Sequence, residues 1–168
     1  SPQALVGKLI MIIGIGWCLL RTSRSAYAET VGEPAISDMN EAIREADEAL
    51  WVEFREWMTT NSSPTLQWML HEHHNNHDGV LQVFLSRNHR GSPFWDMLTW
   101  IAEHGKGSYG LFYVNDDEDT NRTDFSNVFR VHRLMNGSVE ELADPFFGPI
   151  VPNVEPMHPY DRDIPDES

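Results

Sequence analysis

Four consecutive carboxylates separate two aromatic, strand-like segments of this 168-residue chain. Neighbouring negative charges repel one another, and burying them costs more free energy than their pairing returns. The chain must therefore bring this run to the surface, between a predicted strand over residues 109–114 and another over residues 128–134. Solvation, a bound cation or a basic partner would each suit the run, which consists of Asp116, Asp117, Glu118 and Asp119.

Two segments have the periodicity of amphipathic helices. The first is predicted to begin with Ser37 as its N-cap and to run to about Met58, because apolar residues recur at steps of three and four. The second is predicted to begin with Ser92 as its cap and Pro93 as its first residue, and to end at Gly105. The apolar stripes comprise Met39, Ile43, Ala46, Leu50, Phe54 and Trp57 in the first helix, and Phe94, Met97, Leu98 and Ile101 in the second.

Short β-branched and aromatic stretches predict the strands, which cover residues 66–70, 80–85, 109–114, 128–134 and 139–142. The order of elements predicts an α+β fold: an antiparallel-rich sheet with two amphipathic helices packed on one face. We expect the strands over residues 109–114 and 128–134 to be antiparallel neighbours. Their packing residues are predicted to be Leu111, Tyr113, Phe129 and Val131, and the helices are expected to bury Trp57, Leu98 and Ile101.

The N-terminal apolar run over residues 5–20 has two interpretations. Lys8 precedes much of it and Ala26-Tyr27-Ala28 follows it, a pattern typical of a secretory signal peptide. The alternative is a buried first strand that ends between Trp17 and Thr22, with a bulge at its glycines, Gly14 and Gly16. Composition favours the signal peptide and therefore export.

Length and charge predict one acidic domain. We expect a single domain over residues 1–158, whose first eight residues are either frayed or appended to it, and a disordered acidic tail over residues 159–168. The net charge of −14 repels nucleic acid and anionic membranes and attracts basic surfaces. Cys18 is the sole cysteine, so the chain forms no internal disulfide and no cysteine-rich zinc site.

Two polar clusters have residue types that occur in functional sites. His71, His73, His74 and His77 could hold a metal ion, but their spacing and a predicted turn favour solvated, pH-sensitive side chains, so we expect neither a metal nor another cofactor. Asn88, His89 and Arg90 follow a predicted strand and suit either a small anion or a simple connection. No nucleophile elbow or phosphate-binding loop is present, which lowers the expectation of an enzyme.

Several segments together resemble the Imm7 group of immunity proteins from bacterial polymorphic toxin systems. They are SRNHRGS, WIAEHGKGSYGLFYVNDDED, NVFRVHRLMNGSVEE and DPFFGPIVPNVE, within Ser86 to Val154 and its flank, and GWCLLRTS over residues 16–23. The last segment is similar to the opening strand of that family. If it forms a strand here, cleavage after Ala28 would remove part of the core, so the resemblance favours the strand and a cytoplasmic protein.

The resemblance implies a binding protein without enzymatic activity, whose partner is one cognate toxin domain. A basic, nuclease-like toxin would be attracted to the acidic run, which suits a surface that blocks the toxin's active site. The residues expected to contact the partner are Asp116, Asp117, Glu118, Asp119, Asn88, His89 and Arg90. The alternatives are a small metal-dependent hydrolase that uses the histidine-rich turn with the acidic run, and a secreted acidic interaction domain.

Overall fold

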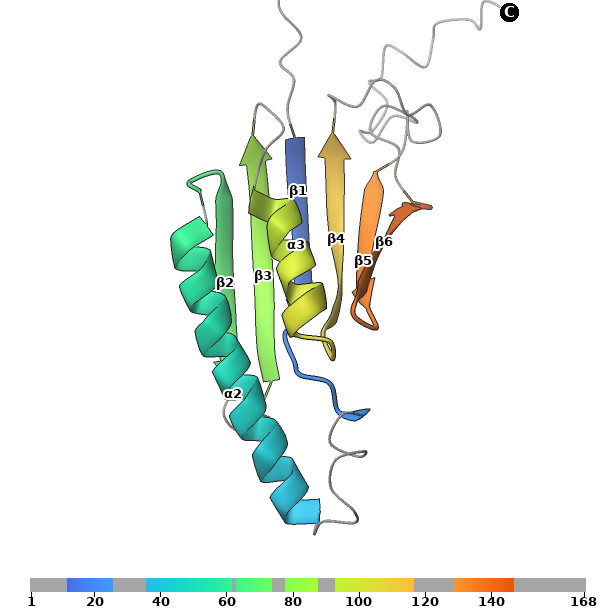
Figure 1. The fold of residues 1–168 in the computed structure, drawn as a ribbon. Helices are drawn as coiled ribbons and strands as arrows, with labels where there is room; N and C mark the ends of the chain where they lie inside the picture. Colours follow the sequence, from blue (N-terminus) through green and yellow to red (C-terminus); the bar gives the residue numbers. More distant parts are fainter. Residues whose placement is uncertain are drawn as a thin grey trace, which may run out of the picture.

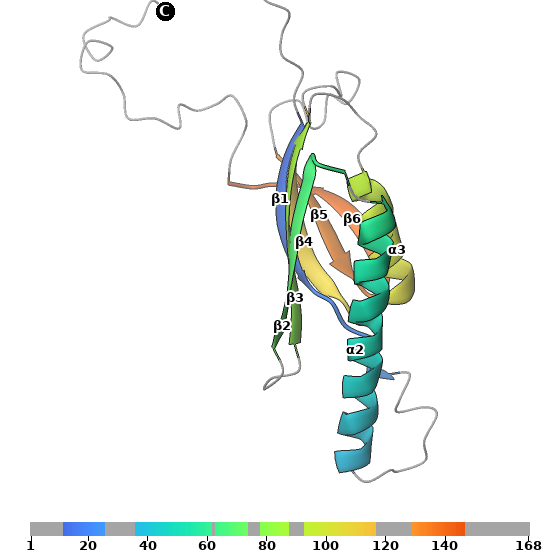
Figure 2. The same cartoon turned by 90° about the vertical axis from the view of Figure 1, so that its left-hand side faces the viewer.

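The computed structural model describes residues 12–25, 36–61, 63–73, 78–87, 93–116 and 129–146. Six antiparallel strands form one sheet in the order β2-β3-β1-β4-β5-β6, and two helices cover one face of it (Figures 1 and 2). The predicted α+β class is confirmed. The elements are β1 (Ile12–Leu19), α2 (Ile36–Asn61), β2 (Leu66–His73), β3 (Asp78–Arg87), α3 (Pro93–His104), β4 (Tyr109–Asp116), β5 (Arg130–Met135) and β6 (Ser138–Ala143).

The apolar run near the N-terminus supplies β1, the strand between β3 and β4. Its pairing with both neighbours is continuous from Ile12 to Leu19, so the predicted bulge is wrong. The glycines serve another purpose. Gly16 faces the helices, and a Cβ atom there would collide with the ring of Phe112 from β4. Glycine therefore lets Phe112 lie across β1, where its side chain is fully buried.

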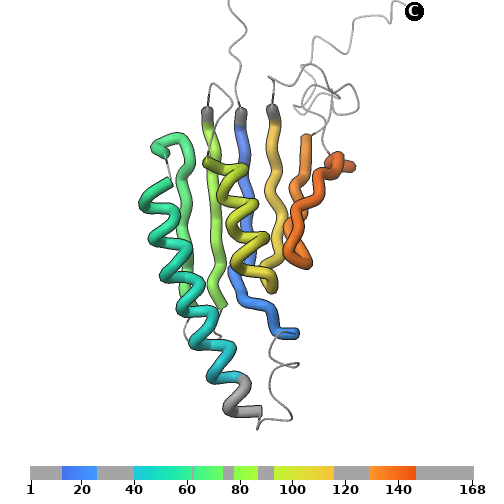
Figure 3. The backbone as a smooth tube through the Cα atoms, in the orientation of Figure 1, coloured from blue at the N-terminus to red at the C-terminus, as the bar shows by residue number. Residues whose placement is uncertain are grey.

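Helix α2 is longer than its apolar pattern predicted, and it extends past the end of the sheet (Figure 3). It begins at Ile36, one residue before the predicted cap, and continues beyond Met58 to Asn61. In the last turn, two side chains donate to carbonyls one turn earlier: Thr59 Oγ1 to Arg55 O and Asn61 Nδ2 to Trp57 O, each at 2.8 Å. These bonds add to the backbone bonds of the helix.

The core lies between the helices and the sheet. Leu98 and Ile101 are buried as predicted, and Trp57 is partly buried and packs against the core. Trp51, which the predicted stripe did not include, is fully buried, and its Nε1 donates to Leu20 O at 2.8 Å. The largest fully buried side chains are Trp51, Phe54, Phe94, Phe112, Leu20, Met58, Leu81, Leu85, Met97, Ile101 and Leu134.

Strands β4 and β5 pair antiparallel, as predicted, and β5 and β6 form a hairpin. The hairpin turns at Asn136 and Gly137, whose φ angles are 53° and 69°, the conformation that an Asn-Gly turn favours. Of the residues predicted to contribute to packing, Val131 is buried and Phe129 is partly buried. On β4, Phe112 and Val114 face the helices and are buried, whereas Leu111 and Tyr113 lie partly buried on the other face. Val128 lies outside the described residues, and so does the predicted tail.

Candidate partner-binding surface

The face of the sheet turned away from the helices is covered by no described element (Figure 2). We call it the open face. On β1 the exposed residues alternate with the buried ones: Ile13, Ile15 and Trp17 lie on the open face, and Gly14, Gly16 and Cys18 face the helices. In most strands with one covered face, the large apolar side chains are the buried ones; on β1 they are the exposed ones.

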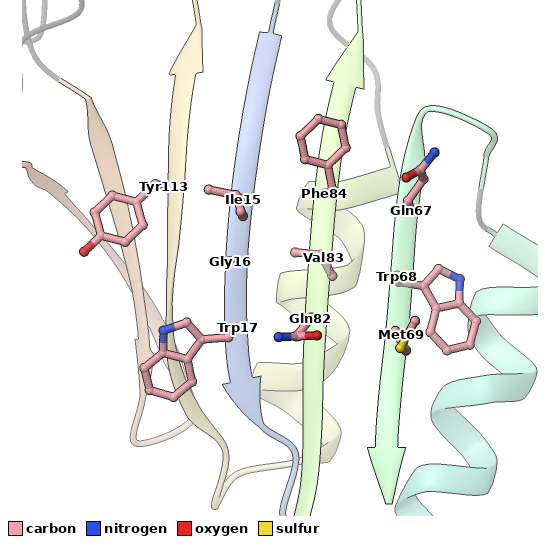
Figure 4. Close-up of a pocket in the computed structure, with 10 residues that line it drawn as sticks. All are labelled: Ile15, Gly16, Trp17, Gln67, Trp68, Met69, Gln82, Val83, Phe84 and Tyr113. Atoms are coloured by element: carbon pink, nitrogen blue, oxygen red, sulfur yellow. The ribbon is translucent and has the colours of Figure 1, made fainter. Parts of the chain in front are cut away.

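The pairing register extends this apolar surface across neighbouring strands. Ile15 pairs with Phe84 on one side and Tyr113 on the other, and Trp17 pairs with Gln82 and Leu111. A groove of about 650 Å³ runs over these strands and β2 (Figure 4). Its lining includes Ile15, Trp17, Gln67, Met69, Gln82, Phe84 and Tyr113.

The groove is apolar and uncharged. Ile15 is 61% exposed and Met69 is 55% exposed, values unusual for large apolar side chains in the middle of a sheet. Among the described residues that line the groove, none carries a charge at neutral pH. On the same face, the ion pair between Arg133 and Glu140 lies further along the sheet, on β5 and β6. In a chain with a net charge of −14, such a patch is typical of a protein-binding surface.

The two predicted contact segments leave the sheet at one end. β3 ends at Arg87 and β4 ends at Asp116, and both residues pair with Ile12 of β1. The sequence therefore places Asn88, His89 and Arg90 along the chain directly after β3, and Asp117, Glu118 and Asp119 directly after β4. All of these residues lie outside the described part of the chain. This end of the sheet adjoins Ile13 of the open face.

The histidine-rich segment lies at the opposite end. His71 and His73 belong to β2 rather than to a turn, which corrects the prediction, and their rings lie 6.5 Å apart. His71 pairs with Val80, which pairs with Leu19, whereas Asp116 pairs with Ile12. Seven residues of β1 separate the two ends, about 23 Å. His71 and His73 therefore lie too far from Asp116 to share one site with it.

No metal centre is visible in the described part of the chain. There, no three side chains of histidine, cysteine, aspartate or glutamate gather in a way that could hold an ion. His74 and His77 lie outside the described residues, so the expectation that the four histidines bind no metal tightly stays a prediction. In the same part of the chain, neither helix is long and apolar enough to cross a membrane.

Two buried titratable groups lie on the helix side of the sheet. Burial raises the pKa of the Cys18 thiol to about 12, so the thiol stays protonated and unreactive. Burial lowers the pKa of His132; the negative charge of Glu141 opposes this shift, and the positive charge of Arg130 adds to it. Trp95 packs its ring edge against His132 at 4.8 Å. Neither group faces the groove.

A comparison with family models assigns this chain to a protein family. The family model described as Immunity protein 7, or Imm7, matches residues 11–156, a span that includes all eight elements of the fold. This chain belongs to the Imm7 family. Comparisons with curated proteins and with solved structures gave no match. The resemblance found in the sequence is thereby confirmed, and the match extends it over α2 and the β2–β3 hairpin, for which no motif was quoted.

Membership of the Imm7 family makes this chain an immunity protein. The role of such a protein is carried by a surface that another protein contacts. Sequence reasoning found the acidic run but missed the open face, because a strand that alternates glycine with large apolar residues looks like a continuous buried run. The available signal was the spacing of Ile13, Ile15 and Trp17, which predicts one shared face.

Proposed function

We propose that this Imm7 protein neutralises a cognate toxin domain by binding it directly and covering its active site. The partner is a domain of a contact-dependent or secreted polymorphic toxin. The observation that carries the proposal is the open face, an uncharged apolar groove on a family member whose role is immunity. Aromatic and methionine side chains are the usual anchors of protein interfaces, and Trp17, Phe84, Tyr113 and Met69 supply both kinds.

The end of the sheet that carries Asp116 forms the charged rim in this proposal. The run Asp116, Asp117, Glu118 and Asp119 would attract a basic, nuclease-like toxin, and its neighbours Asn88, His89 and Arg90 would add polar contacts. Exposed carboxylates of this kind act mainly on association rate and specificity. The apolar groove would then hold the complex together, because desolvated anchors govern dissociation.

The cytoplasm is the proposed place of action. Cleavage after Ala28 would remove β1, which pairs with both β3 and β4 at the centre of the sheet. A chain cleaved after Ala28 would lose Leu20, Cys18 and Gly16, over which Phe112 packs. This supports a strand, rather than an export signal, as the purpose of the apolar run.

Substitutions of exposed residues test the groove without disturbing the core. We expect Ile15→Gln with Met69→Gln to abolish protection in cells that express the cognate toxin and to speed dissociation at least about tenfold. Val52→Gln is the matched control, because Val52 is 54% exposed and lies on α2, on the helix side. Full protection by the folded double variant would overturn the assignment of the open face. An absence of any complex between wild-type protein and toxin would overturn direct binding itself.

A further inference from the structure

A second groove lies on the helix side of the molecule, between α2 and α3. We propose that this helix groove receives an arginine side chain of the toxin, an inference that rests on the proposed function. The groove has a volume of about 410 Å³. It is lined by Glu53, Glu56, Trp57, Thr60, Asn61, Trp100 and His104.

Aromatic rings form one wall of the helix groove. Trp57 and Trp100 lie 6.1 Å apart between ring centroids, with an angle of 31° between their planes. His104 stacks on Trp100 at 4.4 Å and 13°, and its Nδ1 lies 2.9 Å from Trp100 O. Phe54, which is fully buried, contacts Trp100 at 5.7 Å from below. The rings are thus fixed by the core while their outer parts remain accessible.

Two carboxylates belong to the same groove. Glu53 and Glu56 are exposed on α2, one turn apart. Arg55 lies between them in sequence but points elsewhere: its Nη2 donates to Leu70 O at 2.8 Å and lies 3.6 Å from Glu72. Among the described ion pairs, none involves Glu53 or Glu56. The groove therefore joins flat aromatic surface to negative charge that no described cation neutralises.

Arginine matches this combination better than other side chains. Its planar guanidinium stacks on aromatic faces and at the same time donates paired hydrogen bonds to carboxylates. An anionic group would be repelled by Glu53 and Glu56, and an uncharged apolar group would leave them desolvated without a partner. The recognised chemistry is thus one guanidinium, held by π-stacking on Trp57 and by a carboxylate.

The test uses N-acetyl-arginine amide as the probe and N-acetyl-citrulline amide as its uncharged equivalent. Both are titrated into the full chain, and the indole N–H signals of Trp57 and Trp100 are followed by NMR. We expect saturable, millimolar binding of the arginine probe and at least about fivefold weaker binding of the citrulline probe. Glu53→Gln with Glu56→Gln should remove this preference. Glu45→Gln with Glu48→Gln, a pair of exposed carboxylates on α2 outside the groove, should retain it.

Equal binding of the two probes, or an unchanged preference in the Glu53 and Glu56 variant, would overturn the guanidinium site. A second measurement addresses the partner: the same variant should bind the toxin at least about fivefold more weakly than the Glu45 and Glu48 variant. Equal toxin binding would overturn the assignment of the toxin as the source of the arginine. If wild-type protein binds the arginine probe but no toxin, the proposed function fails while the guanidinium site stands.

Discussion

Arg24 donates two hydrogen bonds to the carboxylate of Asp47, from Nη1 to Oδ1 at 2.9 Å and from Nη2 to Oδ2 at 2.7 Å. Asp47 is 1% exposed and also accepts bonds from Thr22 N and Thr22 Oγ1, at 2.8 and 2.7 Å. Asp47 of α2 thus holds Thr22 and Arg24, in the segment that follows β1, in place.

Loss of the Asp47 carboxylate should therefore destabilise the fold strongly. We expect Asp47→Ala to lower the free energy of unfolding by roughly 3 kcal/mol, because it leaves the donors of Arg24 and Thr22 without an acceptor. Urea denaturation measures the change. Glu140→Ala breaks the exposed pair with Arg133 and should cost under about 1 kcal/mol. Equal losses in the two variants would contradict a structural role for the Asp47 network.

Leu98 provides a test of the helix–sheet core. It is buried on α3, so Leu98→Ala should cost roughly 2 to 5 kcal/mol, the range for a cavity left by a core leucine. Val52→Ala on the exposed face of α2 should change stability by about 0.5 kcal/mol or less. Chemical denaturation of both variants compares them directly. A loss under half a kcal/mol for Leu98→Ala would mean that α3 does not pack as described.

His132 should make stability depend on pH. Its pKa is lower in the folded protein than the ordinary value of 6.5, chiefly because burial disfavours the charged form. The unfolded chain therefore binds a proton more readily, so the contribution of His132 to stability is complete above pH 6.5 and declines as the pH falls below it. We expect His132→Phe to flatten the change in unfolding free energy between pH 7.5 and pH 5.5. The same slope in both proteins would assign the effect to other groups.

Cys18 should be inert in the native protein. With its thiol pKa at about 12 and its side chain fully buried, it offers neither thiolate nor access. We expect no reaction with an aromatic disulfide reagent at pH 8, and one thiol per chain to react in urea. Rapid reaction of the native protein would show that β1 opens readily.

Neutralising the acidic run tests the charged rim. Replacing Asp116, Asp117, Glu118 and Asp119 with Asn or Gln should slow association with the toxin and flatten its dependence on salt, since exposed charges steer encounter. Folding stability should change little. Surface-captured toxin at low and moderate salt provides the rates. An unchanged association rate together with full protection would place the contact surface away from this run.

The order of helices and strands could be predicted from the sequence alone, but which face of each strand is covered could not. The helices and the Asn136-Gly137 hairpin follow from local periodicity and turn chemistry, which a chain carries without its neighbours. The open face was not predicted, because β4 carries large apolar residues on both sides and β1 buries its glycines rather than its large apolar residues; only tertiary packing decides which side is covered. The helix groove was not predicted either, because it depends on how α3 packs against α2 and places Trp100 beside Trp57.

The central position of β1 has a consequence for synthesis. Among the described strands, β1 leaves the ribosome first, yet its two partners are β3 and β4, which end at Arg87 and Asp116. A sheet dominated by such distant pairings folds slowly, because long loops must close before the contacts form. Until Asp116 has emerged, Ile13, Ile15 and Trp17 have no completed sheet around them. The open face is therefore complete only after most of the chain has been translated.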